Sequence, residues 1–183
     1  MAIAAMLSLA WWAGAPRAQA QTPVDLALVL AVDGSSSIDE REFTLQMRGY
    51  AQAFRHPQVM EAIRSGPHRR IAVTLVQWSN LYDQSQVIGW TILDGPSAAD
   101  AFAARIVAAP RSVPPGSTSI SGAIEHAIRL LNEAEVATQR RVIYVTGDGL
   151  INMGRPPRVA RDKAVAAGIV VNGLAILSEV PGL

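Results

Sequence analysis

Residues 26–32 (LALVLAV) form an unbroken run of apolar side chains that ends at Asp33. A strand with one face in water alternates apolar and polar residues, whereas a strand covered on both faces can be apolar throughout. The run therefore predicts a central strand with helices packed on both of its faces. The rest of the chain shows the alternation of strands and helices that such an arrangement requires.

The other predicted elements follow in regular order. Asp39 with Glu42 three residues later is typical of the capping box that starts a helix, and Pro57 interrupts the helical pattern that follows. A polar turn between residues 70–78 and 87–93 indicates a hairpin of two strands. The remaining expected elements are helices at 97–109, 120–131 and 159–167, and strands at 141–146 and 169–177. This order predicts an open, doubly wound, mostly parallel α/β sheet with helices on both faces and one antiparallel edge hairpin strand.

Length and composition restrict the class of protein. A chain of 183 residues that is 50% hydrophobic and 17% charged suits one folded domain with a single core. The sequence has no cysteine, which excludes disulfides, zinc–thiolate sites, iron–sulfur clusters and a cysteine nucleophile. A formal net charge of +1 argues against nucleic acid as a partner bound through a basic surface.

Residues 1–20 have the features of a secretory signal. An apolar stretch is followed by Ala18-Gln19-Ala20, the small-x-small pattern after which a signal peptidase cleaves. We therefore predict a signal peptide at 1–20, a mature domain at 21–183, a secreted or periplasmic location and no stable membrane span after cleavage. The alternative is an uncleaved membrane anchor, although the stretch is short for a span of about 20 residues.

Side chains with hard oxygen atoms occur in three loops. Asp33, Ser35 and Ser37 follow the first strand, Thr118 precedes a helix, and Asp148 follows a later strand. In an open α/β sheet, ligands bind beyond the carboxyl ends of the strands, so these loops are expected to meet. Carboxylate and hydroxyl oxygens suit Mg²⁺, Mn²⁺ or Ca²⁺ better than zinc or copper. The sequence thus predicts a divalent-metal site formed by Asp33, Ser35, Ser37, Thr118 and Asp148.

The balance of charge in this set suggests what such a site could bind. Two carboxylates supply roughly the charge of one divalent ion, and three hydroxyls add ligands without repulsion. An ion held this way stays electrophilic and can accept an acidic group from a partner.

Each loop also has a simpler interpretation. Asp33 to Ser37 could be ordinary turn residues, Thr118 could cap the helix that starts near Ser119, and Asp148 could lie in a tight turn. The metal site is favoured because all three loops lie at the expected edge of a strand or a helix.

The three loops resemble a known family motif. Asp33-Gly34-Ser35-Ser36-Ser37, Gly116-Ser117-Thr118 and Thr146-Gly147-Asp148-Gly149 resemble the metal-ion-dependent adhesion site of von Willebrand factor type A domains. The resemblance covers residues 24–177, and the chain is most similar to an uncharacterised exported bacterial group of that type. It implies direct coordination by Ser35 and Ser37, direct or water-mediated binding by Thr118, and contacts mainly through water from Asp33 and Asp148.

The sequence departs from the family pattern at two places. Gly147 separates Thr146 from Asp148, where the family more often has Thr directly before Asp-Gly. Family members also usually continue past the fifth strand with a helix, a sixth strand and a last helix, so we expect this form to be C-terminally incomplete. Residues 169–177 would then be an unprotected apolar edge, and the protein would be poorly soluble or would need a partner strand.

These observations predict an exported, divalent-metal-dependent protein-binding module, not an enzyme, in which an Asp or Glu of an unknown protein partner completes the coordination of Mg²⁺, Mn²⁺ or Ca²⁺. Two alternatives are a metal-dependent hydrolase that uses the same site and a structural domain that binds no ion. The sequence contains no Gly-x-Ser-x-Gly elbow, no P-loop and no dinucleotide-binding turn, which argues against a serine hydrolase or a nucleotide-binding enzyme.

Overall fold

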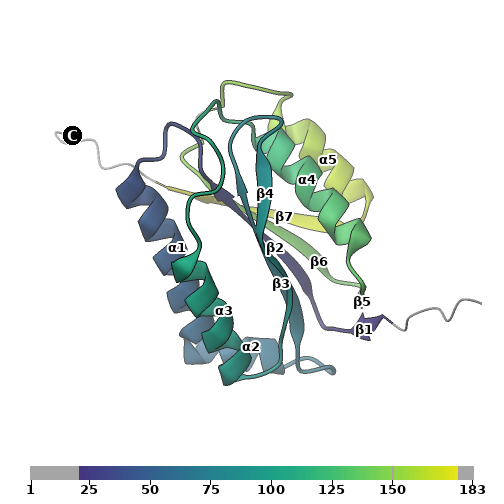
Figure 1. Cartoon of the computed structure of the whole chain (residues 1–183). Helices are drawn as coiled ribbons and strands as arrows, with labels where there is room; N and C mark the ends of the chain where they lie inside the picture. The colour runs from purple at the N-terminus through teal and green to yellow at the C-terminus, as the bar shows by residue number, and fades with distance from the viewer. Residues whose placement is uncertain (1–20, 150, 177–183) are drawn as a thin grey trace, which may run out of the picture.

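A computed structural model describes residues 21–149 and 151–176, and its centre is a five-stranded sheet (Figure 1). The strand order is β4-β3-β2-β6-β7, and only the β3–β4 pair is antiparallel. This confirms the predicted α/β class with one antiparallel edge strand. The five strands are β2 (Ala27–Asp33), β3 (Ile71–Trp78), β4 (Gln84–Leu93), β6 (Arg141–Gly147) and β7 (Ile169–Ala175).

Helices cover both faces of the sheet. One face carries α1 (Glu40–Arg55), α2 (Pro57–Arg64) and α3 (Pro96–Ala108), and the other carries α4 (Ile120–Glu133) and α5 (Pro157–Ala166) (Figure 1). Strand β2 is buried between them: Leu30 packs in the cluster beneath α1 and α3, whereas Val29 packs in the cluster beneath α4 and α5. The two clusters explain why this strand is apolar throughout.

The capping box predicted at the start of α1 is present. The Glu42 N–H donates to the Asp39 carboxylate at 2.7 Å, and the Asp39 N–H donates to the Glu42 carboxylate at 3.0 Å. Pro57 does interrupt the pattern, but a separate short helix, α2, begins there. His56 ends α1 and caps α2. Proline suits the first turn of a helix because its missing N–H would have no partner there.

A second, two-stranded sheet was not predicted. It pairs β1 (Thr22–Pro23) with β5 (Val136–Ala137) in parallel. Strands of two residues have no periodicity to detect, so their pairing depends on the fold that brings them together.

Several predictions fall on residues outside the described part of the chain. The predicted signal peptide at 1–20 and the last residue of the predicted strand 169–177 belong to this group. Within the described residues, Val170 and Leu174 of β7 are exposed, and β7 pairs only with β6. Among the described helices, none combines the length and the apolar character required to cross a membrane.

Candidate metal site at the carboxyl ends of the strands

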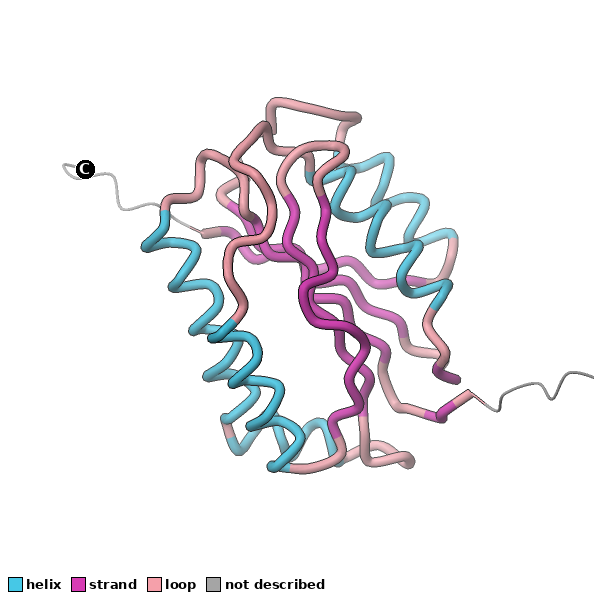
Figure 2. Tube along the Cα trace, viewed as in Figure 1, coloured by secondary structure: helices cyan, strands magenta, loops and turns pink. Residues whose placement is uncertain are grey.

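Three loops meet at the carboxyl ends of the parallel strands, at the top of Figure 2. The first loop follows β2 (residues 34–39), the second joins α3 to α4 (residues 109–119), and the third follows β6 (residues 148–149 and 151–156). The Ser36 backbone N–H and side-chain hydroxyl both donate to the Gly116 carbonyl, at 3.0 and 2.9 Å, and so join the first loop to the second. The second loop contacts the third at Thr118, whose N–H donates to Asn152 Oδ1 at 2.8 Å. The candidate residues are therefore brought to one edge of the sheet by hydrogen bonds of the protein itself.

The approach of the first two loops requires a glycine. The Gly34 N–H donates to the Trp78 carbonyl at 2.7 Å, and a Cβ at position 34 would lie 2.6 Å from Val113 Cγ2. A side chain at position 34 would have to displace Val113, which belongs to the second loop. Gly34 thus allows the serine-containing turn to lie against the loop that carries Thr118.

Asp33 and the two serines form the centre of the candidate site. The Ser35 N–H donates to Asp33 Oδ1 at 2.8 Å, and the hydroxyls of Ser35 and Ser37 are 3.1 Å apart. Asp33 and Ser35 are buried, and Ser37 is exposed. The second carboxylate oxygen, Asp33 Oδ2, is buried and makes no hydrogen bond to a described residue.

This environment changes the acidity of Asp33. Burial raises the pKa of Asp33 from 3.8 to about 6, against the lowering effect of the hydrogen bonds from Ser35. The negative charge of Asp148 raises this pKa further, and the positive charge of Arg111 lowers it. A buried carboxylate with one unpartnered oxygen and a second carboxylate nearby is a site that a cation would stabilise.

Gly147 accounts for one departure from the family pattern. It is the last residue of β6, and a Cβ built on it would lie 2.6 Å from Asp33 Oδ2. The space that a larger residue would need is therefore filled by the Asp33 carboxylate. Gly147 thus leaves room for the Asp33 carboxylate beside the end of β6.

Thr118 is buried, but it does not cap the following helix. The cap of α4 is Ser119, whose hydroxyl accepts from the Gly122 N–H at 3.2 Å. The capping interpretation of Thr118 is therefore wrong. Instead, the Thr118 carbonyl accepts from the N–H groups of Asn152 and Met153, both at 3.3 Å. These bonds hold Thr118 against the loop that contains Asp148.

The five candidate residues offer oxygen ligands of mixed type at this edge. Asp148 is half-buried, and its negative charge contributes to raising the pKa of Asp33. No group of three or more His, Asp or Glu side chains positioned to hold a metal ion occurs within residues 21–149 and 151–176. A cation here would therefore depend on hydroxyls as well as on its two carboxylates.

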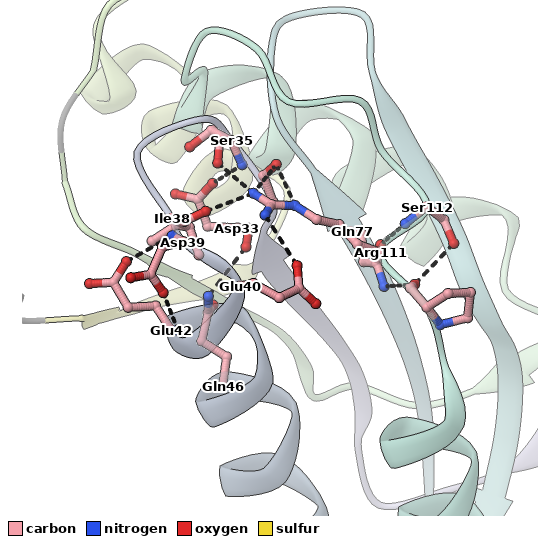
Figure 3. A network of polar contacts seen from close by, with 12 residues as sticks. Asp33, Ser35, Ile38, Asp39, Glu40, Glu42, Gln46, Gln77, Arg111 and Ser112 are labelled. Atoms are coloured by element: carbon pink, nitrogen blue, oxygen red, sulfur yellow. Dashed lines mark hydrogen bonds and ion pairs between the residues drawn. The ribbon is translucent and has the colours of Figure 1, made fainter.

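Three supporting residues were missed in the sequence. Gln46 of α1 donates to the Asp33 carbonyl at 3.3 Å and accepts from the Thr146 hydroxyl at 2.9 Å. A polar side chain on the apolar face of a predicted helix is a signal that could have revealed it. Asn152 and Arg111 contact partners far away in the sequence, so no local pattern indicates them. The contacts of Arg111 are drawn in Figure 3.

Solved structures with the same fold include proteins from a mussel, from Lactobacillus rhamnosus GG and from Plasmodium vivax. A structure of proximal thread matrix protein 1 from the mussel byssus, with a zinc-occupied MIDAS motif, matches with a TM-score of 0.63 and 19% identity over 86% of this chain and 39% of that chain. The pilus adhesin SpaC from Lactobacillus rhamnosus GG gives 0.57 and 14%, over 86% and 25% of the two chains. The manganese-loaded TRAP protein of Plasmodium vivax gives 0.53 and 17%, over 82% and 57%.

These similarities define a von Willebrand type A-like fold. The chain spans 38–39% of the length of the mussel protein. The sequence itself belongs to the family described as "Protein of unknown function (DUF1194)", which matches residues 23–182. No curated protein sequence gives a significant match.

Proposed function

We propose that this protein is an exported, divalent-cation-dependent protein-binding module whose partner contributes an Asp or Glu carboxylate. The observation that supports it most strongly is the environment of Asp33. A buried carboxylate oxygen without a described hydrogen-bond partner lies beside Gly147, at the edge of the sheet that also carries the Ser35 and Ser37 hydroxyls. Leaving such an oxygen unpaired is unfavourable unless a ligand compensates it.

In this proposal, five side chains would hold the cation. Ser35 and Ser37 would bind it directly, Thr118 directly or through water, and Asp33 and Asp148 mainly through water. The bound cation would supply an electrophilic position for a partner carboxylate. The protein contributes the rest: Ser36 and Gly116 hold the first two loops together, and Asn152 holds Thr118 in place.

The chemistry of the donor atoms supports Mg²⁺, Mn²⁺ or Ca²⁺ as the ion. All five side chains offer oxygen, the ligand that these hard cations prefer. The mussel protein with zinc and the TRAP protein with manganese are consistent with a divalent ion in this fold. Mg²⁺ is our first choice because it retains water ligands and is often bound by only one or two carboxylates.

A binding role is supported more than a catalytic one. SpaC, which shares the fold, is an adhesin of a bacterial pilus. The carboxylates of the candidate site are those of Asp33 and Asp148, and in our proposal both are engaged with the cation, mainly through water. Turnover of phosphate esters by the protein, lost in the Ser35→Ala variant, would contradict this proposal and favour a hydrolase.

The cation site can be tested by titrating Mn²⁺ into the purified protein and measuring affinity by calorimetry. We expect saturable binding that is lost in Ser35→Ala and strongly weakened in Thr118→Val. Thr74→Val is the matched control, because Thr74 is also a buried threonine but donates to the Ile88 carbonyl, away from the loops. Equal Mn²⁺ affinities in all four proteins would refute the site.

The partner and the location need separate experiments. Capture of exported proteins with Mg²⁺ and with a chelator should yield a partner only with Mg²⁺, and the Ser35→Ala variant should yield none. Expression with residues 1–20 in a bacterium, followed by fractionation and N-terminal sequencing, should give an exported protein that begins at Gln21. A protein that keeps Met1 in the membrane would support the anchor alternative instead.

A further inference from the structure

Arg111 opens the loop that carries Thr118, and the backbone on both sides of it is anchored. The buried amide of Gln77, in β3, donates to the Pro110 carbonyl at 2.8 Å and accepts from the Ser112 N–H at 2.5 Å. Figure 3 shows this pair of bonds beside the start of the loop. Arg111 therefore extends from a fixed point of the sheet, not from a freely moving loop.

The guanidinium of Arg111 binds the backbone of the serine-containing turn. Its Nη2 donates to the carbonyls of Gly34, Ser35 and Ile38 at 2.8, 2.6 and 2.9 Å, and Nε lies 3.3 Å from the Gly34 carbonyl (Figure 3). These three carbonyls belong to the segment that presents the Ser35 and Ser37 hydroxyls. One side chain thus holds three backbone carbonyls of the turn at once.

Two further contacts fix the plane of the guanidinium. Its Cζ lies 5.3 Å from the centre of the Phe43 ring, and Nη1 lies 3.9 Å from a carboxylate oxygen of Glu40. The side chain is only 17% exposed. A planar group with several donors in a fixed arrangement can hold several carbonyls at once, which an ammonium group does less well.

The positive charge of Arg111 and the hydrogen bonds that it makes to the turn have opposite effects on cation affinity. A positive charge next to a cation site repels the cation and by itself weakens binding. Any favourable effect of Arg111 on cation affinity must therefore come from the position in which it holds the turn. The two effects predict opposite results when the side chain is removed.

We infer that Arg111 is a positioning residue of the candidate cation site, which holds the 33–38 turn in the conformation that binds the ion. This inference rests on the proposed function. Arg111 does not contact the cation itself. It acts on Ser35 and Ser37 through the carbonyls of the turn.

The test compares Mn²⁺ affinity in the wild-type protein, Arg111→Met, Arg111→Lys and Arg141→Met. We expect Arg111→Met to weaken binding by about tenfold or more, as is usual when a group that orients metal ligands is lost. Arg111→Lys keeps the charge but not the planar set of donors, so its affinity should be intermediate. Arg141 is the matched control, because it donates to Asn132 and to the Ala167 carbonyl at the other end of the sheet.

A measurement at two salt concentrations separates geometry from charge. The weakening in Arg111→Met should persist at about 1 M salt and be at least as large as at about 0.1 M, because salt screens the charge repulsion whose removal partly offsets the geometric loss. If Arg111→Met binds Mn²⁺ as tightly as the wild type, or more tightly, the inference is overturned. If Arg111→Met does not fold, unchanged affinity in Arg111→Lys overturns it equally.

Failure of the proposed function would look different. In that case the wild-type protein would show no saturable Mn²⁺ binding, or Ser35→Ala would bind as the wild type does. Wild-type binding that is lost in Ser35→Ala but retained in both Arg111 variants would leave the cation site standing and reject only the role of Arg111.

Discussion

An aspartate lies near each end of strand β2, and the two carboxylates differ in their hydrogen bonds. Asp25, before the strand, accepts from the N–H groups of His68 and Arg70 at 3.0 and 3.3 Å, one on each carboxylate oxygen. Asp33, the last residue of the strand, accepts from Ser35 on one oxygen and leaves the other without a described partner. Both are close to loops, so the difference lies in whether backbone N–H groups donate to both carboxylate oxygens or to only one.

The pKa values of the two aspartates follow this difference. Desolvation acts to raise the pKa of Asp25, but the backbone N–H groups of His68 and Arg70 lower it overall. Burial raises the pKa of Asp33 to about 6. The comparison teaches that an aspartate at a strand end is a ligand candidate when the fold buries it without satisfying it, and a structural residue when the fold satisfies it.

The largest effect expected from this comparison is on cation binding. Asp33→Asn should weaken Mn²⁺ binding by about 100-fold or more, since one of the two carboxylates near the ion is lost and affinity depends on the charge of the ligands. Asp25→Asn should bind as the wild type does. Calorimetric titration of the three proteins measures this, and equal losses in both variants would remove the distinction between the two ends.

The second prediction concerns stability in a metal-free buffer that contains a chelator. The pKa of Asp33 is raised in the folded state, so its contribution to stability is present below pH 3.8 and is lost as the pH rises through about 6. Asp33→Asn removes that loss, and should be more stable than the wild type at pH 7 by up to about 3 kcal/mol, from 1.36 kcal/mol per pKa unit. The advantage should disappear toward pH 4.

Asp25→Asn should show the opposite sign in the same experiment. Because the pKa of Asp25 is lowered in the folded state, its carboxylate stabilises the protein above pH 3.8, and that contribution is lost on acidification. This variant should therefore be less stable than the wild type at pH 7. Urea unfolding of the three proteins at several pH values gives the free energies, and a shared sign would contradict the comparison.

Local sequence patterns were enough to locate parts of the fold. The apolar run at 26–32 and the Asp39–Glu42 spacing are local patterns, and both correctly located a strand and a helix start. The meeting of the three loops at one edge of the sheet can also be predicted, because parallel strands end on the same side of a sheet. Local patterns are therefore enough to predict Asp33, Ser35, Ser37, Thr118 and Asp148 as a set.

What the sequence could not show depends on distant contacts. The contact of Gly147 with Asp33 joins residues on neighbouring strands, and the bonds from Ser36 to Gly116 span 80 residues. The same is true of Arg111, which binds carbonyls that any residue possesses. A backbone acceptor has no identity in the sequence, so partners of this kind are visible only in the folded chain.

The third prediction tests the space beside Asp33. A methyl group at position 147 would lie 2.6 Å from Asp33 Oδ2, so Gly147→Ala should move this carboxylate and destabilise the protein by about 1–3 kcal/mol. Gly173→Ala is the matched control on the neighbouring strand, where a Cβ would meet nothing within 4 Å. Thermal unfolding and Mn²⁺ titration of both variants measure the effect. Equal behaviour would mean that the Asp33 carboxylate can move at no cost.

The smallest expected effect concerns the bond between the first two loops. Ser36→Ala removes the hydroxyl that donates to Gly116 and should cost about 1 kcal/mol of stability or less, because the backbone N–H bond to the same carbonyl remains. Ser65→Ala, which removes an exposed hydroxyl bond to the Ala62 carbonyl far from the loops, should cost a similar amount. Only Ser36→Ala should also lower Mn²⁺ affinity. An unchanged affinity would show that the hydroxyl does not help to shape the site.

Gln46 links helix α1 to the ends of two strands at once. Its amide holds the last carbonyl of β2 with one end and the hydroxyl near the end of β6 with the other. A slide of α1 along its axis by a single residue, about 1.5 Å, would strain both bonds together. Through this one side chain, the axial position of α1 is therefore coupled to the ends of both strands.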